Sequence, residues 1–97
     1  MPTYITLFKF TDQGIKDIKN TPSRIEDNVK SAEAMGCKVI GVYAVMGEYD
    51  FVAISEAPND EAHMALALTI GARGDARSTT LKAFSKEEFG GIVQKLS

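Results

Sequence analysis

The apolar positions of this chain alternate along some segments and recur at helical spacing along others. Four segments rich in β-branched and aromatic residues predict strands, and they span residues 4–10, 38–46, 49–56 and 76–84. Only Gly47 and Glu48 separate the second segment from the third, so these two strands are expected to form a hairpin.

Three longer segments repeat apolar residues at helical spacing. The first opens at Thr21-Pro22, where Thr suits the N-cap and Pro suits the first helical position. The second opens at Asn59, and the third follows Ser85, which begins a Ser-x-x-Glu capping box. Thr11 is expected to cap a further short helix directly after the first strand.

The elements therefore follow the order β-α-β-β-α-β, with a helix added at the C-terminus. This order is the ferredoxin-like arrangement, an α+β fold with one four-stranded antiparallel sheet. Right-handed crossovers place both long helices on the same face of the sheet. Residues 1–97 are expected to form a single domain, since no linker or internal repeat interrupts them.

The second predicted strand is apolar on both of its sides. Val39, Gly41, Tyr43 and Val45 are expected to point one way, and the residues between them, also apolar, the other way. Because the two helices can cover only one face, we expect the second face to meet a partner sheet in a homodimer. A higher oligomer is left open, and so is the alternative in which the C-terminal helix folds over this face.

Composition and charge exclude several classes of protein. The net charge is −2 with no clustered basic excess, so no nucleic-acid partner is expected. No apolar run approaches the ~20 residues that span a bilayer, and the start lacks a signal-peptide pattern, so we expect a cytoplasmic protein without a membrane partner. One Cys and one His cannot supply a structural zinc site, and we expect no metal and no cofactor.

The predicted hairpin carries the strongest candidates for ligand contact. Tyr49 combines an apolar ring with a polar tip, and Asp50 is expected to accept hydrogen bonds near the turn. Gly47 is expected to take a positive φ. Tyr43 shares a strand face with Gly41, where the missing side chain leaves room for a ligand or an aromatic ring.

Three further residues complete the candidate set. His63 is the only imidazole, and beside Asp60 it is interpreted more readily as a solvated helix residue than as a base. Lys9 lies inside an aromatic strand, where it can cross an interface or form an ion pair at its rim. Arg77 belongs to a small group of basic residues near the fourth strand that could bind a carboxylate or phosphate.

Several segments resemble the GYD domain family, which is named for a Gly-x-Tyr-Asp turn. They are residues 9–14 (KFTDQG), 41–43 (GVY), 46–50 (MGEYD) and 79–84 (TTLKAF). The resemblance implies a dimeric α/β barrel, in which two ferredoxin-like units pack their sheets together. It implies no activity, because the family has none established. Haem-degrading relatives in the wider superfamily use a Trp, which this chain lacks, so the resemblance does not favour a haem site.

Three functions remain open at this point. The first is a homodimeric protein that binds a small apolar or aromatic ligand between sheet and helices. The second is an enzyme at the same pocket, a cofactor-independent monooxygenase or an isomerase. The third is an assembly module without a ligand, which the many small residues of the second long helix favour slightly, because they leave little room for a pocket.

Overall fold

The computed structural model describes residues 1–97 and has the expected order of elements. A short α1 and a 3₁₀ turn, η1, precede the first long helix. The elements are β1 (Thr3–Phe10), α1 (Asp12–Lys16), η1 (Ile18–Asn20), α2 (Thr21–Ala34), β2 (Lys38–Ala44), β3 (Phe51–Glu56), α3 (Asp60–Ala72), β4 (Ala76–Ala83) and α4 (Lys86–Val93).

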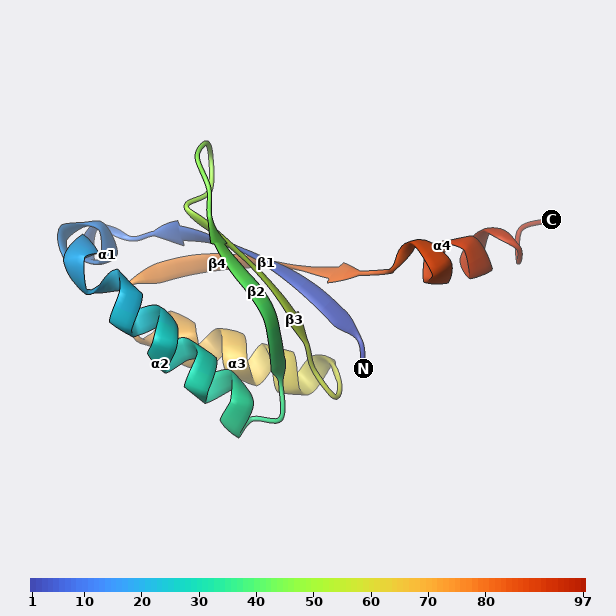
Figure 1. The fold of residues 1–97 in the computed structure, drawn as a ribbon, viewed down its shortest axis with the longest axis horizontal. Coiled ribbons are helices and arrows are strands. Elements are labelled where there is room, and N and C mark those ends of the chain that lie inside the picture. Colours follow the sequence, from blue (N-terminus) through green and yellow to red (C-terminus); the bar gives the residue numbers. More distant parts are fainter.

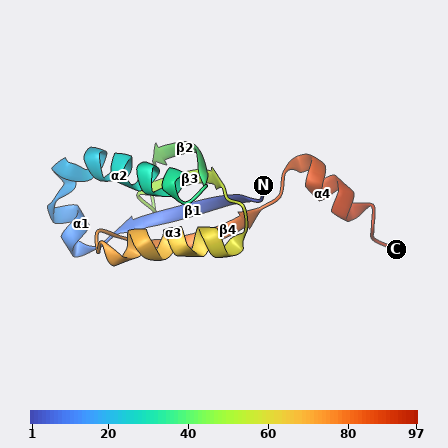
Figure 2. The same ribbon diagram turned by 90° about the horizontal axis from the view of Figure 1, so that it is seen from below.

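The four strands form one antiparallel sheet in the order β2-β3-β1-β4. Helices α2 and α3 lie side by side on one face of this sheet, so the domain has two layers (Figures 1 and 2). This topology is the predicted ferredoxin-like arrangement. The small core between the layers includes Tyr4, Ala32, Cys37 and Leu66. None of the helices combines the length and the hydrophobicity that a membrane-spanning segment requires.

Local sequence signals explain most helix starts. The side chains of Thr11 and Asn59 cap α1 and α3, and Ser85 forms the predicted capping box with Glu88 at the start of α4. The predicted N-cap of α2 was wrong by one residue. Asn20 occupies that position, because η1 runs directly into the helix and makes Thr21 its first helical residue.

Two expectations about β2 are corrected by its pairing with β3. Val39 is paired with Ser55, but Gly41 is paired with Ile54, so one extra residue bulges from β2 between them. The bulge reverses the alternation, and Val39 now faces the helices while Gly41 faces away. The hairpin loop is also longer than expected, because β2 ends at Ala44 and β3 begins only at Phe51.

The sheet face turned away from α2 and α3 is largely apolar, and we call it the open face. Two rows of side chains cross it from β2 to β4, as the strand register shows. The first row is Tyr43, Val52, Leu7 and Thr79, and the second is Gly41, Ile54, Ile5 and Leu81. Lys9 and Arg77, directly opposite each other in the register, stand at one end of the same face.

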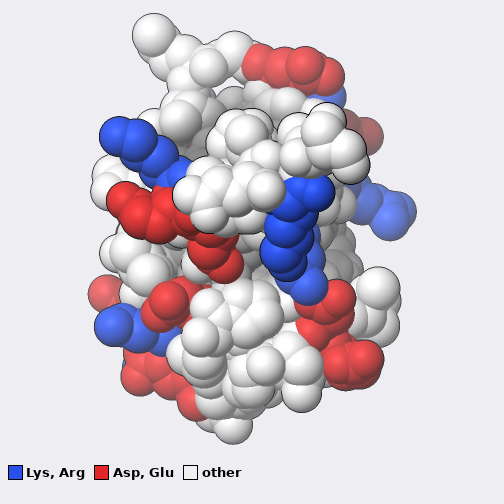
Figure 3. All heavy atoms as spheres, turned by 90° about the vertical axis from the view of Figure 1, so that its right-hand side faces the viewer, with Lys and Arg blue, Asp and Glu red and all other residues white.

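Helix α4 extends away from the domain and does not cover the open face (Figures 1 and 2). The alternative in which the C-terminal helix folds back over the sheet is therefore wrong for a single copy. The molecule measures 52 × 31 × 18 Å along its principal axes, and α4 accounts for its elongation in Figure 1. On the end of the molecule that carries α4, acidic and basic side chains are interspersed with uncharged surface (Figure 3).

Candidate functional site

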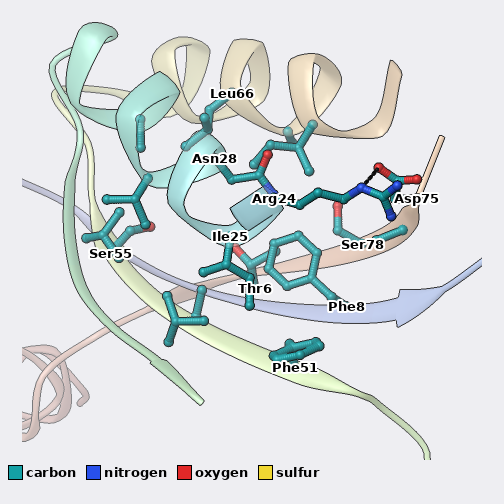
Figure 4. A pocket seen from close by; sticks show the side chains of 18 of the residues that line it. Thr6, Phe8, Arg24, Ile25, Asn28, Phe51, Ser55, Leu66, Asp75 and Ser78 are labelled. Atoms are coloured by element: carbon teal, nitrogen blue, oxygen red, sulfur yellow. Dashed lines mark ion pairs between the residues drawn. The ribbon is translucent and has the colours of Figure 1, made fainter. Parts of the chain in front are cut away.

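A cavity of about 110 Å³ lies between the sheet and the two long helices. Its walls are mostly apolar and include Phe8 and Phe51 from the sheet, Ile25 from α2 and Leu66 from α3 (Figure 4). The Arg24 side chain also lines the cavity, where its Nε lies 3.2 Å from a carboxylate oxygen of Asp75 (Figure 4). The cavity is thus an apolar chamber with an ion pair in its wall.

One polar group in the cavity wall lacks a partner. The Thr21 side chain is 8% exposed, and its hydroxyl makes no hydrogen bond within the protein. Buried hydroxyls are normally hydrogen-bonded, because an unpaired one loses its contacts with water and gains nothing in return. An unpaired hydroxyl in a cavity wall is the feature expected where a ligand or a water molecule completes the structure.

A cluster of polar side chains lies at the end of the sheet near the start of α3. Tyr4 and Lys82 are directly opposite each other on β1 and β4, and both reach Asp60. The Tyr4 hydroxyl donates a hydrogen bond to the Asp60 carboxylate, and Lys82 Nζ lies 3.1 Å from Asp60 Oδ1. Asp60 belongs to the first turn of α3, where the helix dipole also favours its negative charge.

His63 occupies the next turn of α3 and faces inward. Its ring stacks on that of Tyr4 with centroids 4.3 Å apart, and its Nε2 lies 3.4 Å from the Thr6 hydroxyl. The side chain is only 5% exposed, so the interpretation of His63 as a solvated helix residue was wrong. Asp60, one turn earlier on nearly the same side of α3, is exposed to solvent beside Tyr4 and Lys82, whereas His63 lies over Tyr4 and Thr6.

These contacts set the charges of the cluster. The hydrogen bond to Asp60, together with burial, raises the pKa of Tyr4 to about 12. The same bond and the Lys82 ammonium lower the pKa of Asp60. Burial lowers the pKa of His63, against the opposing effect of the Asp60 charge. At neutral pH the cluster therefore holds an ionised Asp60, a protonated Tyr4 and an uncharged His63.

A second cavity, of about 220 Å³, opens beside this cluster. Tyr4, Asp60 and Lys82 line it, and His63 lines both cavities. Tyr4 already donates to Asp60, whereas the Lys82 ammonium and the Asp60 carboxylate are charged groups that retain hydrogen-bonding capacity. The arrangement can bind a small polar group. No group of three or more His, Cys, Asp or Glu side chains is placed to hold a metal ion.

The hairpin candidates lie in the long loop between β2 and β3. The Asp50 carboxylate accepts a hydrogen bond of 2.8 Å from the main-chain N–H of Phe10, which confirms its expected acceptor role. The Asp50 main-chain N–H donates to Phe8 O at 2.8 Å, so this residue fixes the loop to β1. Gly47 has φ of 114°, as expected. Tyr49 is partly buried and lines neither of the two cavities.

Tyr43, Lys9 and Arg77 all belong to the open face, on the opposite side of the sheet from both cavities. The Tyr43 ring lies over Gly41, where an added Cβ would be 3.0 Å from Tyr43 Cε2. The missing side chain at Gly41 thus accommodates an aromatic ring of the same strand. Tyr43 and Tyr4 therefore do not share a cavity, because Tyr4 faces the helices.

The residues that sequence reasoning missed are Thr6, Thr21, Asp60 and Arg24. Tyr4 and Asp60 are 56 positions apart, and only the strand register and the start of α3 bring them together. The available signal was the alternation of β1, which puts Tyr4 and Thr6 on one side with Phe8. That alternation alone does not identify which residues of α3 lie opposite them.

The chain belongs to the GYD domain family, whose model matches residues 4–93. A relative from Thermus thermophilus is 40% identical over 85 residues, which cover 86% of this chain and 88% of the relative. That protein is named glutamine synthetase and cystathionine beta-lyase binding protein.

Two solved structures share the fold. MtbAldR superposes with a TM-score of 0.70 at 15% identity over 88% of this chain, which spans about half of MtbAldR, 52%. TTHA0845 from Thermus thermophilus superposes with a TM-score of 0.58 at 23% identity, over 88% of this chain and 95% of that one. At these identities the similarity establishes the architecture and nothing about function.

Proposed function

We propose that this protein is a homodimeric binding protein that attaches to other enzymes and holds a small apolar ligand between its sheet and helices. The observation that carries the proposal is the open face, an apolar surface across four strands that a single copy leaves in contact with water. Apolar patches of this kind mark interaction sites in proteins. The relative's name supports attachment to enzymes, since it describes a binding protein.

The homodimer is tested by placing a charge on the open face. Wild-type protein should sediment at micromolar concentration as a species of twice 10.5 kDa. Tyr43 is 60% exposed in one copy, so Tyr43→Asp should preserve the fold and dissociate the dimer, because burying an unpaired charge costs several kcal/mol. Met46→Asp is the control, since Met46 is 99% exposed in the hairpin loop. A wild-type monomer would overturn the homodimer.

Attachment to enzymes is tested with purified glutamine synthetase and cystathionine β-lyase from the same organism as this protein. Each enzyme is titrated with the protein, and the complex is detected by a change in sedimentation. A complex with at least one enzyme, at a fixed stoichiometry, supports the proposal. Absence of any complex with both enzymes contradicts this part of it and leaves the homodimer standing.

A ligand in the 110 Å³ cavity is favoured by the unpaired Thr21 hydroxyl. Apolar cavities of similar size hold a small aromatic ring. Phenol and toluene are suitable probes, because they match in size and only phenol can hydrogen-bond to the hydroxyl. Phenol should raise the melting temperature more than toluene does, and Thr21→Val should abolish the difference. Equal shifts in wild type would refute a role for the hydroxyl in binding.

A further inference from the structure

The C-terminal arm, residues 84–97, is an apolar segment without a surface to cover it. Five of its apolar side chains are between 41% and 71% exposed, namely Phe84, Phe89, Ile92, Val93 and Leu96. The last four recur at spacings of three and four residues and thus share one side of the helical segment. In Figure 1 this segment projects beyond the end of the sheet. The arm therefore has the pattern of a helix that packs on something outside its own domain.

Helix α4 is not expected to be stable in isolation. It has eight residues, and isolated helices shorter than ~12–15 residues are marginal in water. Gly90 and Gly91 occupy its interior, where glycine is much less favourable than alanine. The capping box at Ser85 offsets only part of this cost. A docking surface is needed to supply the rest.

The open face carries charges that match those of the arm. Lys9 and Arg77 are adjacent across β1 and β4, and like charges in that position repel each other. The ion pairs within one copy are those of Arg24 and Lys82, so neither Lys9 nor Arg77 is neutralised there. The first turn of α4 is acidic, with Glu87 exposed beside the capping residue Glu88.

The area of the open face also leaves room for the arm. Four strands spaced ~4.8 Å apart, each with about four side chains on one face, present roughly 400–500 Å². A stable interface usually buries about 800 Å² on each partner. Stacked open faces would therefore supply about half of what a stable dimer needs.

We propose that the C-terminal arm is exchanged between two copies of this chain. The arm of each copy packs its apolar side against the second copy beside the open face, with Glu87 next to the partner's Lys9 and the partner's Arg77. The direction of β4 favours this arrangement: Arg77 lies near its start, and the arm follows its end. When two sheets stack with their strands antiparallel, each arm lies near the basic end of the other sheet. The inference rests on the proposed homodimer and names the element that completes it.

The apolar side of the arm is tested in the full-length chain. Phe89→Ser combined with Ile92→Ser should raise the dimer dissociation constant at least tenfold in sedimentation experiments. Both side chains are exposed in one copy, so the fold of the domain should persist, as checked by far-ultraviolet circular dichroism. Gln94→Ser, a polar replacement just beyond α4, is the control and should leave the constant unchanged. An unchanged constant in the double variant would overturn arm exchange while leaving the homodimer intact.

The charge contact is tested by reversal and restoration. Arg77→Glu should weaken the dimer, and adding Glu87→Arg in the same chain should restore it, because a two-fold interface contains the pair twice. In a Cys37→Ser background, chains with Lys9→Cys are mixed with chains with Glu87→Cys and treated with a short bismaleimide. A cross-linked product containing one chain of each kind supports the exchange.

Two outcomes contradict the exchange. Failure of both restoration and cross-linking in a stable dimer would overturn it. Loss of enzyme attachment by the arm variant, with an unchanged dimer constant, would assign the arm to the enzyme instead. A monomeric wild type would be distinct from both outcomes, since it removes the proposed homodimer itself.

Discussion

Thr21→Val should stabilise the empty protein. The Thr21 hydroxyl is buried without a hydrogen-bond partner, and valine has nearly the same shape without the hydroxyl. Removing an unpaired buried polar group recovers its desolvation cost, about 1–2 kcal/mol. Thr and Val have similar helix propensities, so the substitution should not alter the stability of the first turn of α2. For a domain of this size the gain corresponds to a rise of about 4–8 °C in melting temperature per kcal/mol.

A matched substitution should have the opposite sign. Thr6 is also a buried threonine, but its hydroxyl lies 3.4 Å from Nε2 of His63. Thr6→Val leaves the imidazole without this partner and should lower the free energy of unfolding by about 1 kcal/mol. Valine suits a strand at least as well as threonine, so the loss cannot come from backbone preference.

The two variants are compared by urea unfolding, with midpoints and slopes measured on protein stripped of bound molecules by refolding. Equal slopes would show that the variants differ from wild type in stability alone. If Thr21→Val destabilises the stripped protein, the hydroxyl has a partner in the fold, and the argument for an unfilled hydrogen bond is refuted. If it destabilises only protein isolated without refolding, a retained molecule uses the hydroxyl.

Four further substitutions test the packing, the hairpin and the cluster. A Cβ at Gly14 would clash with the main-chain carbonyl oxygen of Asp75, so Gly14→Ala should lower the free energy of unfolding by more than about 2 kcal/mol. Gly71 lies on α3 with open space around it, so Gly71→Ala should raise the free energy of unfolding by about 0.5–1 kcal/mol. Similar effects of the two substitutions would contradict this geometry. Asp50→Ala removes the acceptor for a main-chain N–H of β1 and should lower the free energy of unfolding by about 1–2 kcal/mol, and an unchanged urea midpoint would assign no structural role to this contact. Burial lowers the pKa of His63 below its ordinary 6.5, so the unfolded chain takes up the proton first. The contribution of His63 to the free energy of unfolding should be complete above about pH 6.5 and should fall as the pH drops below that value. In His63→Phe the free energy of unfolding should depend less on pH between about pH 5 and 7.

The order and type of the elements could be predicted because they depend on local signals. Alternation and helical spacing separate strands from helices, and the capping residues Asn59 and Ser85 mark helix starts within the sequence itself. The shift at α2 has a physical cause that the sequence hides. The 3₁₀ turn before Thr21 accepts a hydrogen bond from the Thr21 main-chain N–H at Ile18 O, so the helix already includes Thr21. The residues Thr21-Pro22 alone do not indicate this turn.

The faces of β2 could not be predicted, because a bulge is a property of two strands together. Only the pairing of Gly41 with Ile54 shows that the alternation changes phase after Val39. The same limit applies to the polar cluster. Tyr4 and Asp60 meet because β1 lies beneath the start of α3, and the same placement buries His63 against the ring of Tyr4.

The distribution of apolar residues argues that one copy of the chain is an incomplete folding unit. Apolar residues make up 44% of the sequence, a proportion typical of a globular domain. Yet only ten of 97 residues are buried in a single copy, and no large side chain among them is completely enclosed. Many of the apolar residues that are not buried lie on the open face and the C-terminal arm. A small domain that leaves so much apolar surface in water retains little stability. Neither surface can be covered by the other within one copy, because β4 directs the arm away from the sheet. In the proposed dimer the open faces cover each other and each arm packs against the second copy, so the proposed homodimer and the proposed arm exchange depend on the same excess of apolar surface.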